Sequence, residues 1–345
     1  MATLKELSER TGYSQATISR ILSGDQSLSV TPEARRKVLE EAGRLNYNEN
    51  RSRRGRTPKT VLRIGMAEML TPAQQLDDPY YLYLSNFVRQ GCLDKRYACV
   101  PLERRDERFY VPEGDKLDGI VAIGLFSTAQ IESLAAISSN VVFLDSSPFE
   151  SRFDSVVLSY ELGISLAMEH LVQLGHRKIG FIGPVYKMDD RRQRAPEVRR
   201  QIFIRQMAEQ GLLEEKFLLD PPMEVEATIQ AVENYLRSGS ELPTAFLCAN
   251  EENAVGALRA LTATGYSVPK DVSVISFNDT PRSALVEPPL TSFSTHVDEM
   301  AYTALRLLGE RAVLPEKPPA RTIPLKVMVP PSLVVRASSQ AAPSR

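Results

Sequence analysis

The stretch TLKELSERTGYSQATISRILSG, residues 3–24, predicts two short helices separated by a glycine turn. Its leucines and isoleucines recur at helical spacing, so we expect one helix from Thr3 to Gly12 and a second from Ser14 to Leu22. Glycine has no Cβ and tolerates the backbone conformation that a sharp turn requires. This stretch therefore predicts a small helical unit.

A third helix is expected to begin at Thr31-Pro32-Glu33, which supplies a cap, a proline at the first helical position and an acid in the first turn. Its expected apolar face consists of Val38, Leu39, Ala42 and Leu45. Three helices with a glycine turn between the first two are typical of a helix-turn-helix DNA-binding head, which we assign to residues 1–47.

The outward face of the second helix carries side chains suited to a DNA groove. Gln15 and Arg20 can make paired hydrogen bonds to base edges, and Ala16 can contact a thymine methyl group. Ser14 and Thr17 can reach phosphates. A three-helix module that never touches DNA would also expose polar residues, so these residues alone leave both interpretations open.

The charge of the chain is unevenly distributed. Residues 1–60 contain twelve Lys and Arg against seven Asp and Glu, whereas the remainder contains thirty against thirty-six. A basic head on a mildly acidic body indicates that the head meets a polyanion.

Residues 48–60, NENRSRRGRTPKT, form a polar, basic linker that ends near a proline. Its candidate DNA-contacting residues are Arg51, Arg53, Arg54 and Arg56. These arginines suit a narrow minor groove or phosphates. The alternative is a flexible, solvated tether.

From Val61 onward, short β runs alternate with amphipathic helices, as in parallel α/β sheets covered on both faces. The expected strands are VLRIGMA, ACVPLE, GIVAIG, VVFLD, SVVLS, KIGFIG, AFLCAN and VSVISFN. This core contains more residues than a domain built on a single sheet usually has, so we predict two lobes. We assign lobe 1 to about 61–160 and 292–321, lobe 2 to about 161–291 and 322–337, and a tail to 338–345.

Polar side chains follow several of these strands, at the sheet edge where α/β proteins bind ligands. Aromatic, carboxylate, amide and guanidinium groups together suit a sugar, which needs an apolar slab and partners for its hydroxyls. The candidate effector-binding residues are Tyr80, Tyr81, Asp145, Arg199, Asn250 and Asn278. Each has a structural alternative: core aromatics for the tyrosines, a helix cap for Asp145, a solvated face for Arg199 and a turn for Asn250.

Several function classes find no support in the sequence. It carries no phosphate-binding loop, no nucleophile elbow and no His/Cys cluster, so we expect no enzyme, no metal and no cofactor. Cys92, Cys99 and Cys248 lack metal-like spacing and fit a reducing compartment. Without a secretory or membrane-spanning segment, we expect a cytoplasmic, nucleoid-associated protein.

The head stretch, the following LSVTPEARRKVLEEAGRLNY and the core segments HLVQLGHRKIGFIGP and AFLCANEENAVGALRALTATGYSVPKDVSVISFNDT resemble the lactose/galactose repressor family of bacterial transcription regulators. The resemblance implies a helix-turn-helix head on a two-lobed core like that of periplasmic binding proteins. It further implies that the family's base-reading positions fall on Gln15, Ala16 and Arg20, and its effector contacts on Asp145, Arg199, Asn250 and Asn278.

The sequence departs from the family pattern in places. The linker lacks the leucine that in the family wedges into the minor groove, Glu251 and Asn278 replace common aspartates, and the run RRQRAPEVRR is longer than usual. Arg200 therefore competes with Arg199 for the effector-contacting position.

DDPYY, FNDTP and VMVPPSLVVR look most like the β-galactosidase-operon repressor subgroup, which implies a galactoside effector and a repressor of sugar-utilisation genes. No leucine heptad follows Arg336, so a homodimer is expected, with Leu84, Phe87 and Val88 as candidates for its face. The alternatives are a co-repressed regulator with a non-sugar effector, a sugar-binding module, and a glycosidase using cleft carboxylates.

Overall fold

The computed structural model describes residues 4–22, 28, 30–44, 61–112, 116–313 and 318–343. The chain divides into two compact units, Met1–Thr60 and Val61–Arg345. Leu45 and the four linker arginines lie outside the described residues. No helix in the described part of the chain is both long and apolar enough to cross a membrane.

The first unit contains the three predicted helices, α1 (Leu4–Thr11), α2 (Gln15–Leu22) and α3 (Pro32–Arg44). Gly12 has φ +81° between α1 and α2, which explains the glycine at this turn. The small core contains Leu7, Ile18, Ile21, Val38 and Ala42. Leu39 was expected on the buried face but is 49% exposed, because Val38 and Ala42 already define a face from which the next residue points away.

The first lobe of the second unit contains a parallel sheet in the order β15-β7-β6-β5-β1-β2. Its strands are β1 (Arg63–Glu68), β2 (Ala98–Pro101), β5 (Gly119–Ile123), β6 (Val141–Leu144), β7 (Asp154–Leu158) and β15 (Lys326–Val329). Its helices are α4 (Pro72–Asp77), α5 (Pro79–Lys95), α6 (Thr128–Ile137) and α11 (Val297–Arg311). The antiparallel pair β3 (Glu103–Arg105) and β4 (Arg108–Tyr110) completes the lobe.

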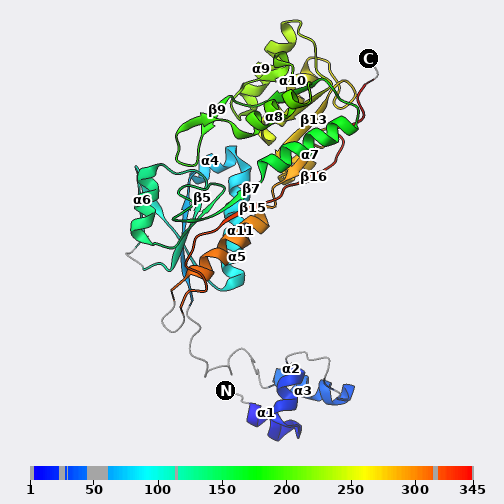
Figure 1. Cartoon of the computed structure of the whole chain (residues 1–345). Helices are drawn as coiled ribbons and strands as arrows, with labels where there is room; N and C mark the ends of the chain where they lie inside the picture. Colours follow the sequence, from blue (N-terminus) through cyan, green and yellow to red (C-terminus); the bar gives the residue numbers. More distant parts are fainter. Residues whose placement is uncertain are drawn as a thin grey trace. The chain divides into compact units, whose positions relative to one another are not determined.

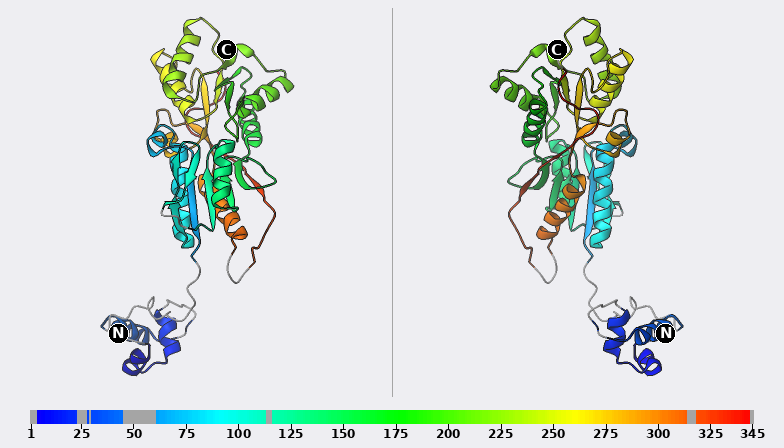
Figure 2. Two further views of the ribbon diagram at one scale, coloured as in Figure 1. Left: turned by 90° about the vertical axis from the view of Figure 1, so that its left-hand side faces the viewer. Right: turned by 90° about the vertical axis from the view of Figure 1, so that its right-hand side faces the viewer.

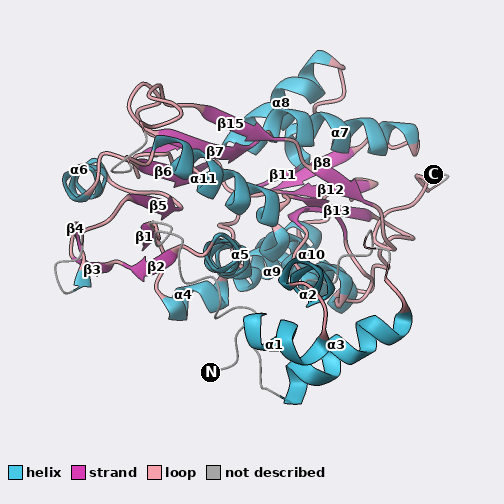
Figure 3. Cartoon of the chain, turned by 90° about the horizontal axis from the view of Figure 1, so that it is seen from below, coloured by secondary structure: helices cyan, strands magenta, loops and turns pink. Residues whose placement is uncertain are grey.

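Helices cover both faces of this sheet (Figures 1 and 3). Helices α5 and α11 pack on one face through a shared core, and α6 packs on the other through Ile131 and Leu134. Leu84 and Val88 are fully buried in the α5–α11 core and Phe87 is partly buried against it. Leu84 and Val88 are therefore core residues, and their expected place on a dimer face is corrected.

The second lobe contains a sheet in the order β11-β8-β12-β13-β14-β16, in which only β16 is antiparallel. Its strands are β8 (Ile179–Ile182), β11 (Leu218–Leu219), β12 (Ala245–Cys248), β13 (Ser273–Asn278), β14 (Thr291–Ser294) and β16 (Ser332–Val334). Its helices are α7 (Tyr160–Gln173), α8 (Val198–Glu209), α9 (Val225–Arg237), α10 (Glu251–Ala263), and the short η3 (Glu215–Phe217) and η4 (Pro281–Ala284). A hairpin of β9 (Tyr186–Met188) and β10 (Arg194–Pro196) stands apart from the sheet.

All eight predicted strands are present, but the allotment of two later segments to lobes differs from expectation. Strand β14 pairs with β13 in the second lobe, and β15 pairs with β7 in the first. The chain therefore crosses between lobes after β7, after β14 and after β15 (Figure 2). The expected tail also packs on the second lobe, since buried Ser338 donates its hydroxyl proton to the carbonyl of Val274.

Candidate nucleic-acid interface and ligand pocket

Helix α2 exposes the residues that the sequence assigns to DNA. Gln15, Ala16 and Arg20 are exposed, whereas Ile18 and Ile21 are buried against the other two helices. An exposed face of this composition can enter a major groove without disturbing the core of the head.

The start of α2 is held by a local hydrogen-bond network. The Ser14 hydroxyl accepts from the backbone N–H of Thr17 at 3.1 Å, and the two hydroxyl oxygens lie 2.8 Å apart. Ser14 therefore acts as a helix cap, and the predicted phosphate contacts of both residues would be made by hydroxyls that the cap already orients.

A half-buried carboxylate, Asp145, lies at the carboxyl end of β6, in the first lobe. Tyr80 and Tyr81 donate their hydroxyl protons to Asp145 at 3.1 and 2.8 Å. Burial raises the pKa of Asp145, while Lys187 and the two tyrosines oppose that shift. Asp145 has φ +70° and caps no helix, so its helix-cap alternative is not supported. The two tyrosines hold this carboxylate in one orientation.

Asp145 faces a pocket of about 450 Å³ between the lobes. The first lobe contributes Tyr81, Leu125, Asp145 and Ser147, the crossover strands contribute Val157, Leu158, Lys326 and Met328, and the second lobe contributes Tyr160, Glu161, Lys187, Met188, Asp189, Asp190, Ala195, Pro196, Val198 and Ile202. This volume lies within the range of small-molecule sites, and aromatic, aliphatic and carboxylate groups line it together. The pocket can therefore hold a polar ligand with an apolar face.

The geometry distinguishes the two competing arginines. Arg199 is buried, bonds Glu197 at 2.7 Å and lies 4.9 Å from the centre of the Tyr160 ring, which lines the pocket. Arg200 instead donates to the carbonyls of Gly183 and Leu219, both at 2.8 Å. Arg200 therefore clamps backbone segments, whereas Arg199 lies beside the pocket and not on a solvated face.

The two candidate asparagines lie elsewhere. Asn250 caps α10 by accepting from the N–H of Asn253 at 3.0 Å, a structural role that differs from the turn considered as its alternative. Asn278 and Tyr80 line a neighbouring pocket of about 310 Å³ with residues of α5 and α11. Tyr81 and Asp145 therefore line the larger pocket, and Tyr80 and Asn278 line the smaller one. Arg199 and Asn250 line neither of these two pockets.

Two acids that the sequence analysis did not select, Asp78 in the first lobe and Glu252 in the second, have raised pKa values. Burial raises the pKa of Asp78 to about 6, with a further contribution from Asp145. Burial and the charge of Asp78 raise the pKa of Glu252, in the first turn of α10, to about 8. One oxygen of each carboxyl is buried without a hydrogen-bond partner in the part of the chain that the structure describes. Asp78 stands directly before Pro79 and the two tyrosines, which could have drawn attention to it. Nothing in the sequence near Glu252 distinguishes that residue from an acid on the surface.

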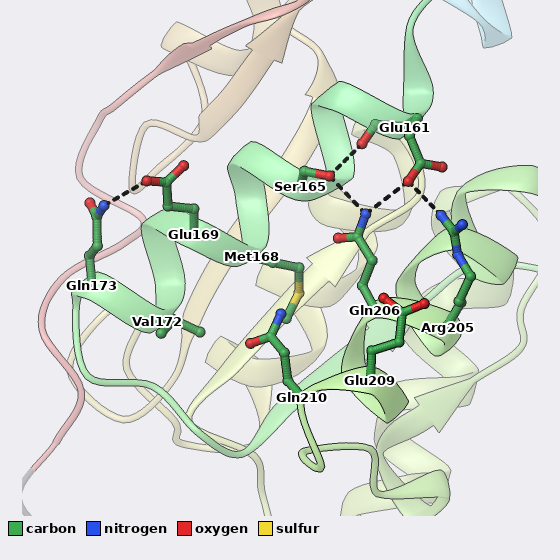
Figure 4. A pocket seen from close by; sticks show the side chains of 10 residues that line it. All are labelled: Glu161, Ser165, Met168, Glu169, Val172, Gln173, Arg205, Gln206, Glu209 and Gln210. Atoms are coloured by element: carbon green, nitrogen blue, oxygen red, sulfur yellow. Dashed lines mark hydrogen bonds and ion pairs between the residues drawn. The ribbon is translucent and has the colours of Figure 1, made fainter.

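A further pocket of about 390 Å³ lies between α7 and α8 (Figure 4). Its polar groups bond one another, since Glu161 pairs with Arg205 at 2.5 Å and Gln206 donates to Ser165 at 2.7 Å. Those side chains are already satisfied, so this groove offers less to a ligand than the pocket between the lobes.

A helix-turn-helix unit in the same chain as a two-lobed unit with an interlobe pocket defines a class of protein, the ligand-responsive DNA-binding regulators. A model of the periplasmic binding protein-like domain matches residues 168–339. The regulator GanR of Bacillus subtilis is 32% identical over 90% of this chain and 93% of its own length. The regulator GalR of Lacticaseibacillus casei is 32% identical over 98% and 100%.

A solved structure of the lac repressor dimer, bound to operator and an anti-inducer, is 24% identical and has a TM-score of 0.63 over 99% of both chains, which supports the fold. The chain belongs to the LacI/GalR family of transcriptional regulators.

Proposed function

We propose that this regulator binds an operator as a homodimer and is released from it when a small sugar, a galactoside, enters the interlobe pocket. The observation that carries the proposal is the Asp145 carboxylate, fixed by two tyrosines at the wall of a pocket shared by both lobes. A fixed carboxylate accepts from sugar hydroxyls without reordering, and ring faces cover the C–H side of a sugar. The resemblance to the β-galactosidase-operon repressors supports the choice of a galactoside.

The proposed effector contacts are Tyr80, Tyr81, Asp145, Arg199, Asn250 and Asn278. Tyr81 and Asp145 have the strongest support because they line the larger pocket. Asn250 has the weakest, since its side-chain oxygen already caps α10 and its Nδ2 donates to Glu252 at 2.9 Å.

The proposed DNA contacts are Ser14, Gln15, Ala16, Thr17 and Arg20 of the head and Arg51, Arg53, Arg54 and Arg56 of the linker. Two heads of a dimer would read half-sites about one helical turn apart. The linker arginines would contribute a salt-dependent, sequence-independent share of the affinity.

Coupling between sugar and DNA would act through the angle between the lobes. Three crossovers connect the lobes, so a ligand that contacts both lobes favours one angle over others. The change in operator binding free energy that the ligand causes equals the difference between its binding free energies for the DNA-binding and the released arrangements of the lobes, typically about 1–3 kcal/mol.

The proposal places the dimer in the cytoplasm, associated with the nucleoid, and gives it no catalytic activity. Incubation with a nitrophenyl galactoside should release no nitrophenol, and turnover would favour the glycosidase alternative.

On α5, Leu93 is 70% exposed and replaces Leu84 and Val88 as the candidate for a dimer contact. Sedimentation should give twice the 38.4 kDa protomer mass.

The test is fluorescence anisotropy with DNA from the region upstream of the protein's own gene, at fixed salt, with galactose, lactose and unrelated metabolites. We expect specific binding that a galactoside reverses. Binding strengthened by a metabolite would replace the inducer with a co-repressor. The absence of specific binding under every condition would overturn the DNA-binding proposal and leave a sugar-binding module.

A further inference from the structure

The β9–β10 hairpin is an ordered element where the sequence suggested only a long polar run. Lys187 pairs with Ala195 across its two strands. At its turn, the Asp189 carboxylate accepts from the backbone N–H groups of Arg191 and Gln193 at 2.9 and 2.8 Å. These bonds fix the turn, so the side chains of the hairpin have defined directions.

The hairpin belongs to the second lobe but contacts the first. The Arg191 guanidinium lies 5.8 Å from the centre of the ring of Phe149, which belongs to the first lobe. Figure 1 shows the hairpin, labelled β9, extending from the second lobe toward the first. It therefore forms a wall of the interlobe pocket that both lobes hold in place.

Most charged groups of this pocket already have partners. Glu161 pairs with Arg205 at 2.5 Å, Lys326 pairs with Glu150 at 2.7 Å, and Asp189 is occupied by the hairpin turn. The groups that remain available to a ligand are Lys187, Asp190 and the outer lone pairs of Asp145.

Lys187 is the unusual member of this group. Its ammonium lies 5.8 Å from the centre of the Tyr160 ring and has no carboxylate within 4.0 Å among the described residues. Burial lowers the pKa of this lysine, although the charges of Glu197, Asp145 and Asp190 oppose the shift. A partly buried ammonium without a direct acceptor gains when a ligand oxygen supplies one.

We propose that Lys187 and Asp190 of the β9–β10 hairpin are effector-contacting residues that select an uncharged saccharide. Lys187 donates to saccharide oxygens, and Asp190 accepts from hydroxyl groups on the opposite side of the ligand. Among the lining groups that remain available, one cation and two carboxylates give a net negative charge, and the nearby Arg199 is already paired with Glu197, so a phosphorylated sugar is disfavoured. The inference rests on the proposed function, in which this pocket holds the effector.

The test is isothermal titration calorimetry of the full chain with galactose, lactose and galactose 6-phosphate. Lys187→Met and Asp190→Asn should each weaken saccharide binding roughly tenfold or more, because each removes a charge-assisted hydrogen bond. Arg194→Gln is the matched control: it lies on the same hairpin but stacks on Tyr186, 4.1 Å from the ring centre, and does not line the pocket. It should change the affinity less than twofold.

The outcomes separate this inference from the proposed function. The far-ultraviolet circular dichroism spectrum of each variant should match that of the wild type, which separates loss of a pocket contact from loss of the fold. Should Lys187→Met fail to fold, Lys187→Gln carries the same expectation. If the wild type binds a saccharide and both substitutions leave its affinity unchanged, the proposed role of the hairpin is wrong but the proposed function stands. Tighter binding of galactose 6-phosphate than of galactose would have the same meaning. A wild-type protein that binds no saccharide would overturn both proposals.

Discussion

Arg20 is the residue on which DNA specificity should depend most. It is exposed near the end of α2, on the side opposite buried Ile18 and Ile21, so its loss leaves the core of the head intact. A guanidinium that bonds a guanine edge contributes about 1–3 kcal/mol of discrimination. Arg20→Ala should therefore weaken operator binding by that amount while binding to random DNA persists.

Anisotropy on operator and scrambled duplexes measures both quantities. Arg10→Ala, on the exposed side of α1, is the matched control and should alter the two affinities equally or not at all. An equal loss on both duplexes for Arg20→Ala would mean that Arg20 contacts only phosphate.

Glu252 should make the stability of the core depend on pH. Burial and Asp78 raise its folded-state pKa from the ordinary 4.5 to about 8, against the opposing charge of Arg282. Between these pH values the folded protein keeps a proton that the unfolded chain releases, so stability falls as pH rises through this window and levels off above it. Glu252→Gln stays neutral and should flatten this dependence.

Urea midpoints at several pH values between about 5 and 9 check this expectation. The control is Glu226→Gln, whose side chain is 80% exposed and should leave the pH profile unchanged. A wild-type profile that stays flat above pH 5 would contradict the protonation of Glu252.

At the scale of elements, the strands were predictable where burial on both faces leaves a continuous apolar run. GIVAI and VVFL, for example, are fully buried as β5 and β6. The allotment of β14 and β15 to lobes was not predictable, because each short strand pairs with a partner fixed by long-range folding. The β9–β10 hairpin was also missed, since its alternating charges read as a solvated segment.

The same contrast holds for the site. The position of Tyr81 and Asp145 in the pocket lining was predictable because both follow strands of the sheet at the edge where such folds bind ligands. Lys187 was not, because only the folded hairpin brings it over Tyr160. The prediction that Leu84 and Val88 form a dimer face was wrong because apolar residues on a helix can face either the core of the protomer or a partner subunit. The spacing of apolar residues alone cannot distinguish these two environments.

Strand β8 contains a glycine that packing requires. A Cβ at Gly180 would lie 2.5 Å from the Phe246 ring and 2.7 Å from the carbonyl oxygen of Phe217. Gly180→Ala should therefore strain the second lobe by about 1–3 kcal/mol and lower its thermal midpoint by several degrees.

Gly309→Ala in α11 is the control, because its new Cβ would meet only the Tyr97 hydroxyl at 3.1 Å and alanine favours a helix. Circular dichroism melts should show this variant at or above the wild-type midpoint. Equal midpoints for wild type and Gly180→Ala would mean that the lobe relaxes around the added methyl group.

For the whole molecule, the central question is whether the pocket in the core and the head on DNA influence each other. The two lie in separate compact units, so their coupling must pass through a change in the arrangement of the lobes. Binding free energies are reciprocal: a sugar that weakens operator binding must itself bind more weakly to the operator complex, by the same factor.

The most direct measurement is a calorimetric titration of the full-length protein with the releasing galactoside, free and then saturated with operator DNA. We expect the Kd of the sugar to rise in the operator complex by roughly 5- to 150-fold, matching the loss of operator affinity in the converse experiment. The same Kd in both titrations would contradict coupling between the interlobe pocket and the DNA-binding head.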